Sequence, residues 1–275
     1  FALQCFTNAG DKVLVQPPVY HPYHHVTHDL ERTLVTSPLK LVNGQFEIDF
    51  EDFEEKIKGC RMFLLCNPHN PGGRVWTKEE LARMCRICAE NDVLVISDEI
   101  HCDMALKGYK HTPFVMSCEE AKERCITFMA ASKTFNIAGL KSSYHIIQNE
   151  ELRNRYHEFL RKSELDTAHV FATGPVATAY NEGDEWLEQM LEYVEATDKE
   201  YLEELKMMFD LIGRAHFDEK KNEVITISFF YVREQFLNKY PQFMTEKDRK
   251  KDDAVQAAKK ESEENSNVVE MSKVG

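Results

Sequence analysis

The sequence predicts an α/β fold built on a mainly parallel sheet, and two observations support this prediction. First, residues 61–66 and 93–97 are continuous apolar runs, as in strands that are buried on both faces. Second, a helix is predicted between them, because Thr77-x-x-Glu80 has the spacing of a capping box. That helix directs an apolar face inward, formed by Leu81, Met84, Cys85 and Cys88. Strands that alternate with capped helices are typical of parallel sheets.

The elements before this unit are shorter. Residues 1–6 have the composition of a helix interior without a cap, so we interpret the first residue as a cut end. A strand is predicted at Lys12–Gln16, and Pro17-Pro18 closes it. A short helix is predicted at Asp49–Lys58, with one apolar face formed by Phe50, Phe53 and Ile57.

The elements after this unit continue the alternation. A buried strand at 125–129 leads into a stretch of small residues around Lys133, and a further strand is predicted at 143–147. Helices are predicted at Glu150–Lys162 and Trp186–Phe209, and one more strand at 224–232. After about Thr245 charged and polar residues dominate, so residues 245–275 are predicted to be a disordered tail.

Composition excludes some classes of function. The chain has 275 residues and a formal charge of −13, which argues against nucleic acid as a main partner. No apolar run approaches the length that spans a membrane. The eight cysteines form no dense framework and several lie in apolar runs, so we expect reduced thiols in a cytoplasmic protein.

Two groups of residues have features of metal sites, and we favour a structural role for both. Cys85-x-x-Cys88 has no second C-x-x-C to complete it, and both cysteines lie on the apolar face of a predicted helix. Residues 19–28 hold four histidines, of which His24 and His28 have i,i+4 spacing, but no H-E-x-x-H pattern accompanies them. We therefore predict no metal.

Four polar or aromatic residues each follow the end of a predicted strand: Tyr20, Asn70, Asp98 and Lys133. In parallel sheets, ligands bind beyond the carboxyl ends of the strands. We therefore expect these side chains to gather at one edge of the sheet. Taken singly, each has an ordinary structural explanation, as a strand-end carboxylate, a turn asparagine, a rim aromatic or a surface lysine.

These residues and their neighbours occur in an order that resembles that of a known protein family. The stretches Pro17-Pro-Val-Tyr20, Asn67-Pro-His-Asn-Pro-Gly-Gly73, Ser97-Asp-Glu-Ile-His101 and Ser132-Lys-Thr-Phe-Asn-Ile-Ala-Gly-Leu140 occur in that order. Together they resemble fold-type-I pyridoxal-phosphate enzymes of the aminotransferase class I/II family. Within it the Asp-Glu-Ile-His form looks most like the cystathionine β-lyase branch, also called cysteine-S-conjugate β-lyase. The resemblance covers roughly residues 1 to 205.

The resemblance implies a cofactor, pyridoxal 5′-phosphate, and residues that hold it. Lys133 matches the lysine that binds the cofactor aldehyde, and Asp98 matches the carboxylate at the ring nitrogen. Asn70 matches the donor to the ring's O3′, and Tyr20 matches the aromatic residue that stacks on the ring. Three further positions match residues around the cofactor, His101 in the β-lyase form and Ser132 and Lys141 near the phosphate.

The resemblance also implies a function. We expect a carbon–sulfur β-lyase that cleaves cystathionine or cysteine S-conjugates to a thiol, pyruvate and ammonia, with Lys133 as the general base. Two alternatives stay open: an aminotransferase of the same family, and a non-catalytic remnant. Family members carry an N-terminal phosphate-binding turn and a C-terminal arginine for the substrate carboxylate, and neither has a matching motif in this sequence.

The expected organisation follows from the same resemblance. Residues 1–185 are expected to form a partial cofactor-binding large domain, and residues 186–244 a long helix with the remnant of a small C-terminal domain. The expected partners are a small amino-acid thioether substrate and a second copy in a homodimer, with no nucleic acid and no membrane.

Overall fold

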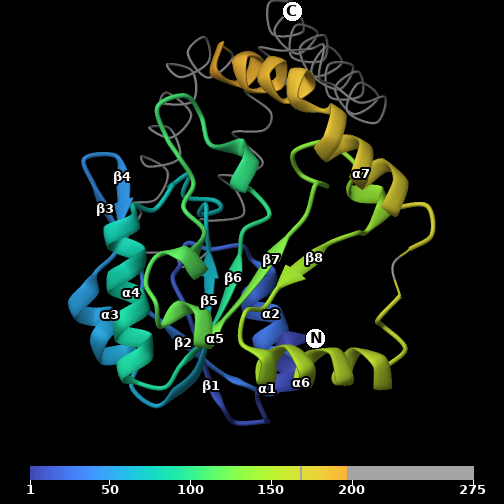
Figure 1. Ribbon diagram of the computed structural model, residues 1–275. Helices are drawn as coiled ribbons and strands as arrows, with labels where there is room; N and C mark the ends of the chain where they lie inside the picture. The colour runs from blue at the N-terminus through green and yellow to red at the C-terminus, as the bar shows by residue number, and fades with distance from the viewer. Residues whose placement is uncertain (168, 197–275) are drawn as a thin grey trace, which may run out of the picture. The chain divides into compact units, whose positions relative to one another are not determined.

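The fold is organised around a six-stranded sheet in a computed structural model that describes residues 1–167 and 169–196. The strand order is β2-β1-β5-β6-β7-β8 (Figure 1). The strands are β1 (Lys12–Val15), β2 (Thr33–Thr36), β5 (Cys60–Cys66), β6 (Leu94–Asp98), β7 (Cys125–Met129) and β8 (Tyr144–Ile146). All neighbouring pairs are parallel except β7 and β8, which run antiparallel. The predicted mainly parallel sheet is confirmed.

Helices cover both faces of this sheet, because the central strands are apolar on both sides. In β5, Phe63 and Leu65 point into one core with α3 (Phe50–Lys56) and α4 (Lys78–Glu90). Met62 and Leu64 point into the opposite core with α1 (Ala2–Phe6) and α6 (Glu150–Lys162). Figure 1 shows α3 and α4 on one side of the sheet and α1 and α6 on the other. The period-two alternation of a strand therefore builds both cores from one run of apolar residues.

Three helices begin where the sequence supplies a side-chain cap. The Thr77 hydroxyl accepts a hydrogen bond from the Glu80 backbone N–H, and the Glu80 carboxylate accepts one from the Thr77 N–H, so the predicted capping box is present. The Asp49 side chain caps α3 by accepting from the Asp52 N–H, and the Asn149 side chain caps α6 by accepting from the Leu152 N–H. All four residues predicted on the inward face of α4 are fully buried: Leu81, Met84, Cys85 and Cys88. These caps satisfy N–H groups that a helix start leaves unpaired.

Several short elements have no counterpart in the prediction. They are α2 (Pro22–Asp29), α5 (Ala121–Arg124), α7 (Thr173–Glu182), strand β2 and a hairpin of β3 (Lys40–Val42) and β4 (Gln45–Glu47). Helix α2 could not be predicted from apolar periodicity, because its residues are mostly histidine, tyrosine and other polar types. Only Thr27 on it is buried. The local 3.6-residue pattern is too weak there to indicate a helix.

The C-terminal predictions fall mostly outside the described residues. Residues 184–196 are helical, in agreement with the first part of the helix predicted at Trp186–Phe209. The rest of that helix, the strand at 224–232 and the tail at 245–275 lie outside the described residues. The first compact unit spans Phe1–Glu195, and the predicted domain boundary at 185 stays a prediction.

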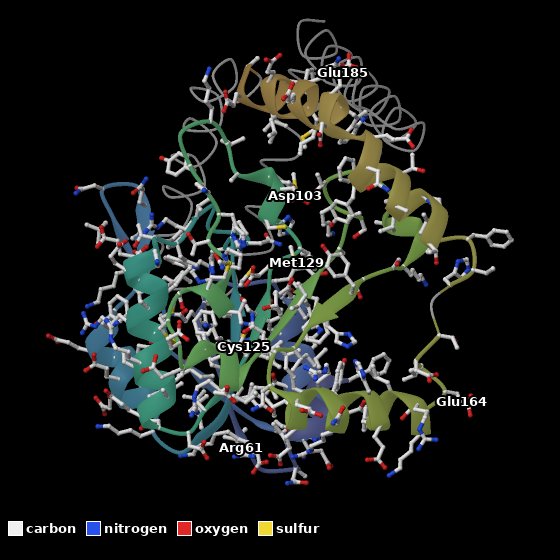
Figure 2. All side chains as sticks on the ribbon, viewed as in Figure 1. Arg61, Asp103, Cys125, Met129, Glu164 and Glu185 are labelled. Carbon is white, nitrogen blue, oxygen red and sulfur yellow. A yellow bond between two sulfur atoms is a disulfide. The ribbon has the colours of Figure 1, made fainter. Side chains whose placement is uncertain are left out.

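The side chains along β7 mark the edge that leads to Lys133. Figure 2 labels Cys125 and Met129, the two ends of this strand. Cys125, Ile126 and Thr127 are buried, and the burial is only partial at Phe128 and Met129, where the strand emerges.

Within the described ranges, the structure holds no helix of the length and apolar character that a membrane crossing requires.

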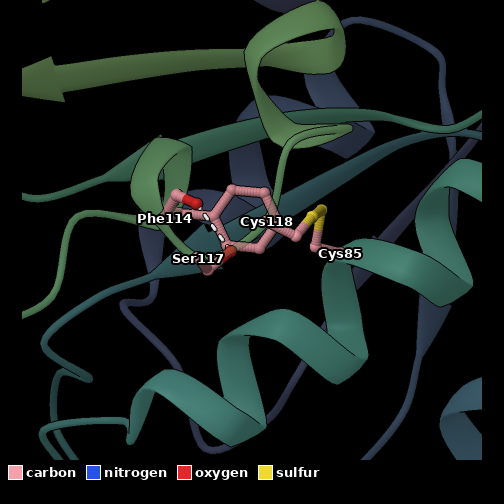
Figure 3. Close-up of a disulfide and its surroundings, with 4 residues drawn as sticks. All are labelled: Cys85, Phe114, Ser117 and Cys118. Atoms are coloured by element: carbon pink, nitrogen blue, oxygen red, sulfur yellow. Dashed lines mark hydrogen bonds between the residues drawn. A yellow bond between two sulfur atoms is a disulfide. The ribbon is translucent and has the colours of Figure 1, made fainter.

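The expectation of eight reduced thiols is wrong for one pair. Cys85 on α4 and Cys118, which follows the 3₁₀ turn Phe114–Met116, form a disulfide (Figure 3). The bridge ties α4 to the segment before β7, and the Ser117 hydroxyl donates a 2.7 Å hydrogen bond to the Phe114 carbonyl beside it. The sequence argument failed because 33 residues separate the two cysteines, and spacing alone does not bring them together. The other six cysteines are buried free thiols.

Candidate functional site

The carboxyl ends of four neighbouring parallel strands form the edge at which the predicted residues gather. Tyr20 follows β1, Asn70 follows β5, Asp98 is the last residue of β6 and Lys133 follows β7. These strands are adjacent in the order β1-β5-β6-β7. The structure therefore brings the four positions to one edge of the sheet, where open α/β sheets bind their ligands.

Asp98 is the polar centre of this edge. Its carboxylate accepts a 2.8 Å hydrogen bond from the Tyr23 hydroxyl and a 3.3 Å bond from the backbone N–H of Ile100. Burial raises the pKa of Asp98, and the hydrogen bonds from Tyr23 and Ile100 and the positive charge of His101 act in the opposite direction. The carboxylate is thus held in a position where a neighbouring cation would favour its ionised form.

Tyr23 is a site residue that the sequence analysis missed. It lies in the first turn of α2, and its backbone N–H donates a 3.0 Å hydrogen bond to the Tyr20 carbonyl. The two rings meet edge to face with centroids 6.0 Å apart. Tyr20 itself is 41% exposed, so its ring has an open face, whereas Tyr23 turns its hydroxyl inward to Asp98. Tyr20 lies before α2, so no helical spacing relates the two tyrosines, and the sequence offered only a second tyrosine three positions after Tyr20 as a signal.

The charges of both Asp98 and Lys133 affect the pKa of His101. Its pKa is lowered by burial first, raised by the charge of Asp98 and lowered by the charge of Lys133. Both charged groups are therefore close enough to act on one imidazole. Among the described residues, nothing forms a hydrogen bond with its buried Nε2 atom. A buried polar atom without a partner is uncommon in native structures and calls for an explanation.

The turn that carries Asn70 is braced from several sides. The Asn70 backbone N–H donates to the Cys66 thiol at 3.2 Å, and the Asn67 side-chain amide donates to the Thr112 carbonyl at 3.0 Å. The His69 Nε2 atom lies 2.8 Å from the Pro18 carbonyl, which joins this turn to the one that carries Tyr20. The peptide bonds before Pro18, Pro68 and Pro71 are cis. These contacts fix the turn, and hence where Asn70 lies relative to Asp98.

The segment around Lys133 is a series of turns. The Phe135 N–H bonds to the Ala131 carbonyl at 2.9 Å, and the Ile137 N–H bonds to the Ser132 carbonyl at 3.1 Å. Ser132 is half-buried and Lys133 is exposed, so the lysine amine can be reached from solvent. Lys141 ends the following 3₁₀ turn in the left-handed region, with φ 48°, and is exposed. Within the described part of the chain, neither Ser132 nor Lys141 forms a hydrogen bond or ion pair with any of the four residues at this edge.

A sheet with this topology and a carboxylate and an amine at the ends of adjacent strands is the large-domain fold of fold-type-I pyridoxal-phosphate-dependent transferases. The comparisons with known proteins then give the family. The family model for aminotransferase class I and II matches residues 1–229. The chain belongs to this family.

Several individual relatives have names that state a narrower activity than the family name does. Cystathionine beta-lyase PatB of Bacillus subtilis is 42% identical over 196 residues, which are 70% of this chain and 51% of PatB. Cystalysin from Treponema denticola, whose structure contains pyridoxal 5′-phosphate, has a TM-score of 0.71 and 33% identity over 78% of this chain and 53% of cystalysin. The pyridoxal-phosphate-bound C–S lyase from Staphylococcus hominis has a TM-score of 0.70 and 35% identity over 76% of this chain and 54% of the lyase. The chain spans about half the length of these relatives.

Proposed function

We propose that the chain carries the cofactor-binding site of a pyridoxal-phosphate-dependent carbon–sulfur β-lyase, acting on cystathionine or cysteine S-conjugates and yielding a thiol, pyruvate and ammonia. The single observation that carries the proposal is the buried Asp98 carboxylate at the end of β6, with Lys133 beyond the end of the adjacent strand and both acting on the charge of His101. The relatives named as cystathionine β-lyase and C–S lyase support the same reaction.

The donor set fits the cofactor. The ring nitrogen of pyridoxal phosphate needs an anion, and burial leaves Asp98 with a raised pKa that an adjacent cation would bring down. The buried Nε2 atom of His101 has no hydrogen-bond partner among the described residues, and a polar group of the cofactor would supply one. The exposed Lys133 amine is accessible to an aldehyde, and the open face of Tyr20 is accessible to a flat ring.

We assign the roles as follows. When bound, the cofactor withdraws electrons from the substrate Cα, which acidifies the Cα–H bond. Asp98 holds the ring nitrogen protonated, Tyr23 orients Asp98, and Asn70 donates to the ring oxygen. Lys133 would hold the cofactor aldehyde through Nζ, and its free amine would accept the Cα proton. Tyr20 would stack on the ring, and Ser132 and Lys141 would contact the phosphate.

The remaining parts of the proposal concern partners and location. The substrate is a small amino-acid thioether, because the named relatives cleave carbon–sulfur bonds. The chain pairs as a homodimer and works in the cytoplasm, both by analogy with the family. The homodimer is tested by light scattering at several chain concentrations, and a single monomer mass throughout would contradict it.

The cofactor part is tested with absorbance spectra of the full chain titrated with pyridoxal phosphate. We expect a new near-visible band in the wild type and its loss in Lys133→Ala. Lys78→Ala is the matched control, because Lys78 is an exposed lysine in the first turn of α4 and takes no part in the site. A band of equal strength in Lys133→Ala would overturn the assignment of the lysine. No band in the wild type would favour a non-catalytic remnant.

The reaction is tested separately with cystathionine. Release of pyruvate and ammonia in equal amounts supports the lyase. Exchange of an amino group with a 2-oxo acid, without ammonia, would contradict the lyase and favour an aminotransferase. Because the spectrum reports binding and the product assay reports chemistry, loss of either result identifies which part of the proposal fails.

A further inference from the structure

Two histidines from different elements meet beside the last strand of the sheet, β8, on the face that α1 and α6 cover. His145 lies in the antiparallel strand β8 and His157 in α6. Their Nε2 atoms are 3.1 Å apart, and the ring centroids are 5.3 Å apart at an interplanar angle of 66°. The two nitrogens are within hydrogen-bonding distance of each other, and an ion would replace the proton that they share.

The separation of the nitrogens suits a metal ion. Imidazole nitrogens bind Zn²⁺ at about 2.0–2.1 Å. For two nitrogens 3.1 Å apart, those bond lengths give an N–metal–N angle of roughly 95–102°. This value falls between the right angle of square-planar or octahedral coordination and the wider angle of a tetrahedron. To chelate one ion, the rings must turn so that both lone pairs point to the ion and not along the line between the nitrogens.

The rings are held by packing on the sheet. Tyr156, which is buried, meets the His145 ring edge to face at 5.0 Å, and Phe128 packs against both residues at 6.1 Å. His157, the next residue on α6, is exposed, and its ring lies against that of His145. The packing of His145 limits the conformational freedom that this side chain would lose on binding.

The surroundings are open and carry charges of both signs. The pair lines a surface cavity of about 400 Å³ together with Glu158, Leu160, Arg161 and Asp166. Burial first, and the neighbouring His157 second, lower the pKa of His145. In the parts of the chain that the structure describes, no third histidine, cysteine or carboxylate atom completes a cluster with the pair. Water would fill the remaining coordination positions.

We propose that His145 and His157 form a binding site for a divalent transition-metal ion of the kind that imidazole prefers, such as Zn²⁺, Ni²⁺ or Cu²⁺. The ion joins β8 to α6. This site is separate from the cofactor residues and does not depend on the proposed function. The prediction of no metal made from the sequence considered the histidines of α2 and the Cys85–Cys88 pair, and it did not consider this pair.

The site has a defined place relative to the candidate cofactor site. Asp98 pairs with Phe128 across β6 and β7, and Phe128 pairs with His145 across β7 and β8. The three residues thus lie in one row of the sheet, two strand spacings or about 10 Å from end to end. An ion at His145 braces the strand beside β7, which leads to Lys133.

The test is isothermal titration of the full, cofactor-free chain with NiCl₂, together with thermal unfolding in the same solutions. We expect one equivalent to bind at the pair and to raise the melting temperature, because an ion that binds only the folded chain stabilises it. His157→Gln and His145→Gln should each weaken this binding at least tenfold, because one ligand of a chelating pair is lost.

The matched control addresses the other histidines. His21, just before α2, and His25 within it have ring centroids 4.0 Å apart, and His24 and His28 have the same spacing in sequence. The double variant His24→Gln/His25→Gln breaks both pairs and should leave the stabilising equivalent unchanged. Loss of that equivalent in the double variant, unchanged binding in His157→Gln, or no binding to the wild type would each overturn the proposal.

Discussion

The Tyr23 hydroxyl and the Asp98 carboxylate form a 2.8 Å hydrogen bond between residues 75 positions apart in the chain. Burial raises the pKa of Asp98, and this hydrogen bond is the first of the interactions that oppose the rise. Asp98 in turn raises the pKa of Tyr23, after burial as the main cause, so the proton stays on the phenol. Tyr23 is therefore a permanent donor that keeps Asp98 oriented and favours its ionised form.

The first prediction concerns Tyr23→Phe. Removing the hydroxyl removes an interaction that lowers the pKa of Asp98, so that pKa rises further. Cofactor binding needs the ionised carboxylate, and its affinity should then be lost at a higher pH as the solution is acidified. At neutral pH we expect an affinity about tenfold weaker, from about 1.5 kcal/mol for one hydrogen bond to a charged group. Pyridoxal-phosphate titrations at a series of pH values measure both effects.

Tyr20→Phe is the companion variant for this prediction. It keeps the ring and removes a hydroxyl that makes no hydrogen bond with Asp98, whose phenol partner is Tyr23. Its pH midpoint should match the wild type. A midpoint for Tyr23→Phe that is unchanged, or shifted to lower pH, would contradict the role assigned to the phenol.

The second prediction separates stability from binding at Asp98. Because burial holds the folded-state pKa above its unfolded value, ionising Asp98 costs folding free energy at pH values above that range. This cost decreases as pH falls from the folded-state pKa to the unfolded-state pKa, below which the carboxyl is neutral in both states. Asp98→Asn is neutral at every pH and its amide oxygen can still accept from Tyr23. We therefore expect unfolding of the cofactor-free variant at neutral pH to need as much denaturant as the wild type, or more.

Cofactor affinity should move the other way in Asp98→Asn. Loss of a charge-assisted hydrogen bond costs about 1.5–3 kcal/mol, which is roughly a tenfold to 150-fold loss. Denaturant titration and cofactor titration of the same preparation measure the two properties. A variant that is clearly less stable and binds the cofactor as tightly as the wild type would reverse both expectations.

The sequence predicted the sheet and the edge of the site because both depend on local patterns. Apolar runs indicate buried strands, and Asp98 and Lys133 can be placed simply as residues that follow them. Tyr23 was missed because its importance lies in a contact with a distant residue, and because α2 has almost no apolar stripe. The Cys85–Cys118 disulfide was missed for the same reason, since sequence spacing does not report which helix faces which loop.

The third prediction concerns that disulfide. Closing a loop of 33 residues lowers the entropy of the unfolded chain, which corresponds to about 3–4 kcal/mol in the chain-entropy model. Adding reductant to the wild type should therefore lower the free energy of unfolding by up to that amount. Cys118→Ser should begin at the lower stability and show no further response to reductant. Equal stability of the wild type with and without reductant would contradict a stabilising bridge.

The fourth prediction concerns Glu99, whose side chain is fully buried beside Asp98 in the sequence but points into the core. Its carboxylate accepts hydrogen bonds from the Ser97 hydroxyl at 2.7 Å and from the Phe114 N–H at 2.9 Å, and it lies 2.7 Å from Nε2 of His111. It thus ties the end of β6 to the segment that carries the disulfide.

Glu99→Ala leaves these groups buried without an acceptor and should cost about 3–5 kcal/mol of unfolding free energy. Glu99→Gln keeps one acceptor oxygen and should cost less, whereas Glu119→Gln, at an exposed surface position, should cost little. Denaturant unfolding of the three variants ranks them, and a Glu99→Ala chain as stable as Glu119→Gln would show that the network contributes nothing to the fold.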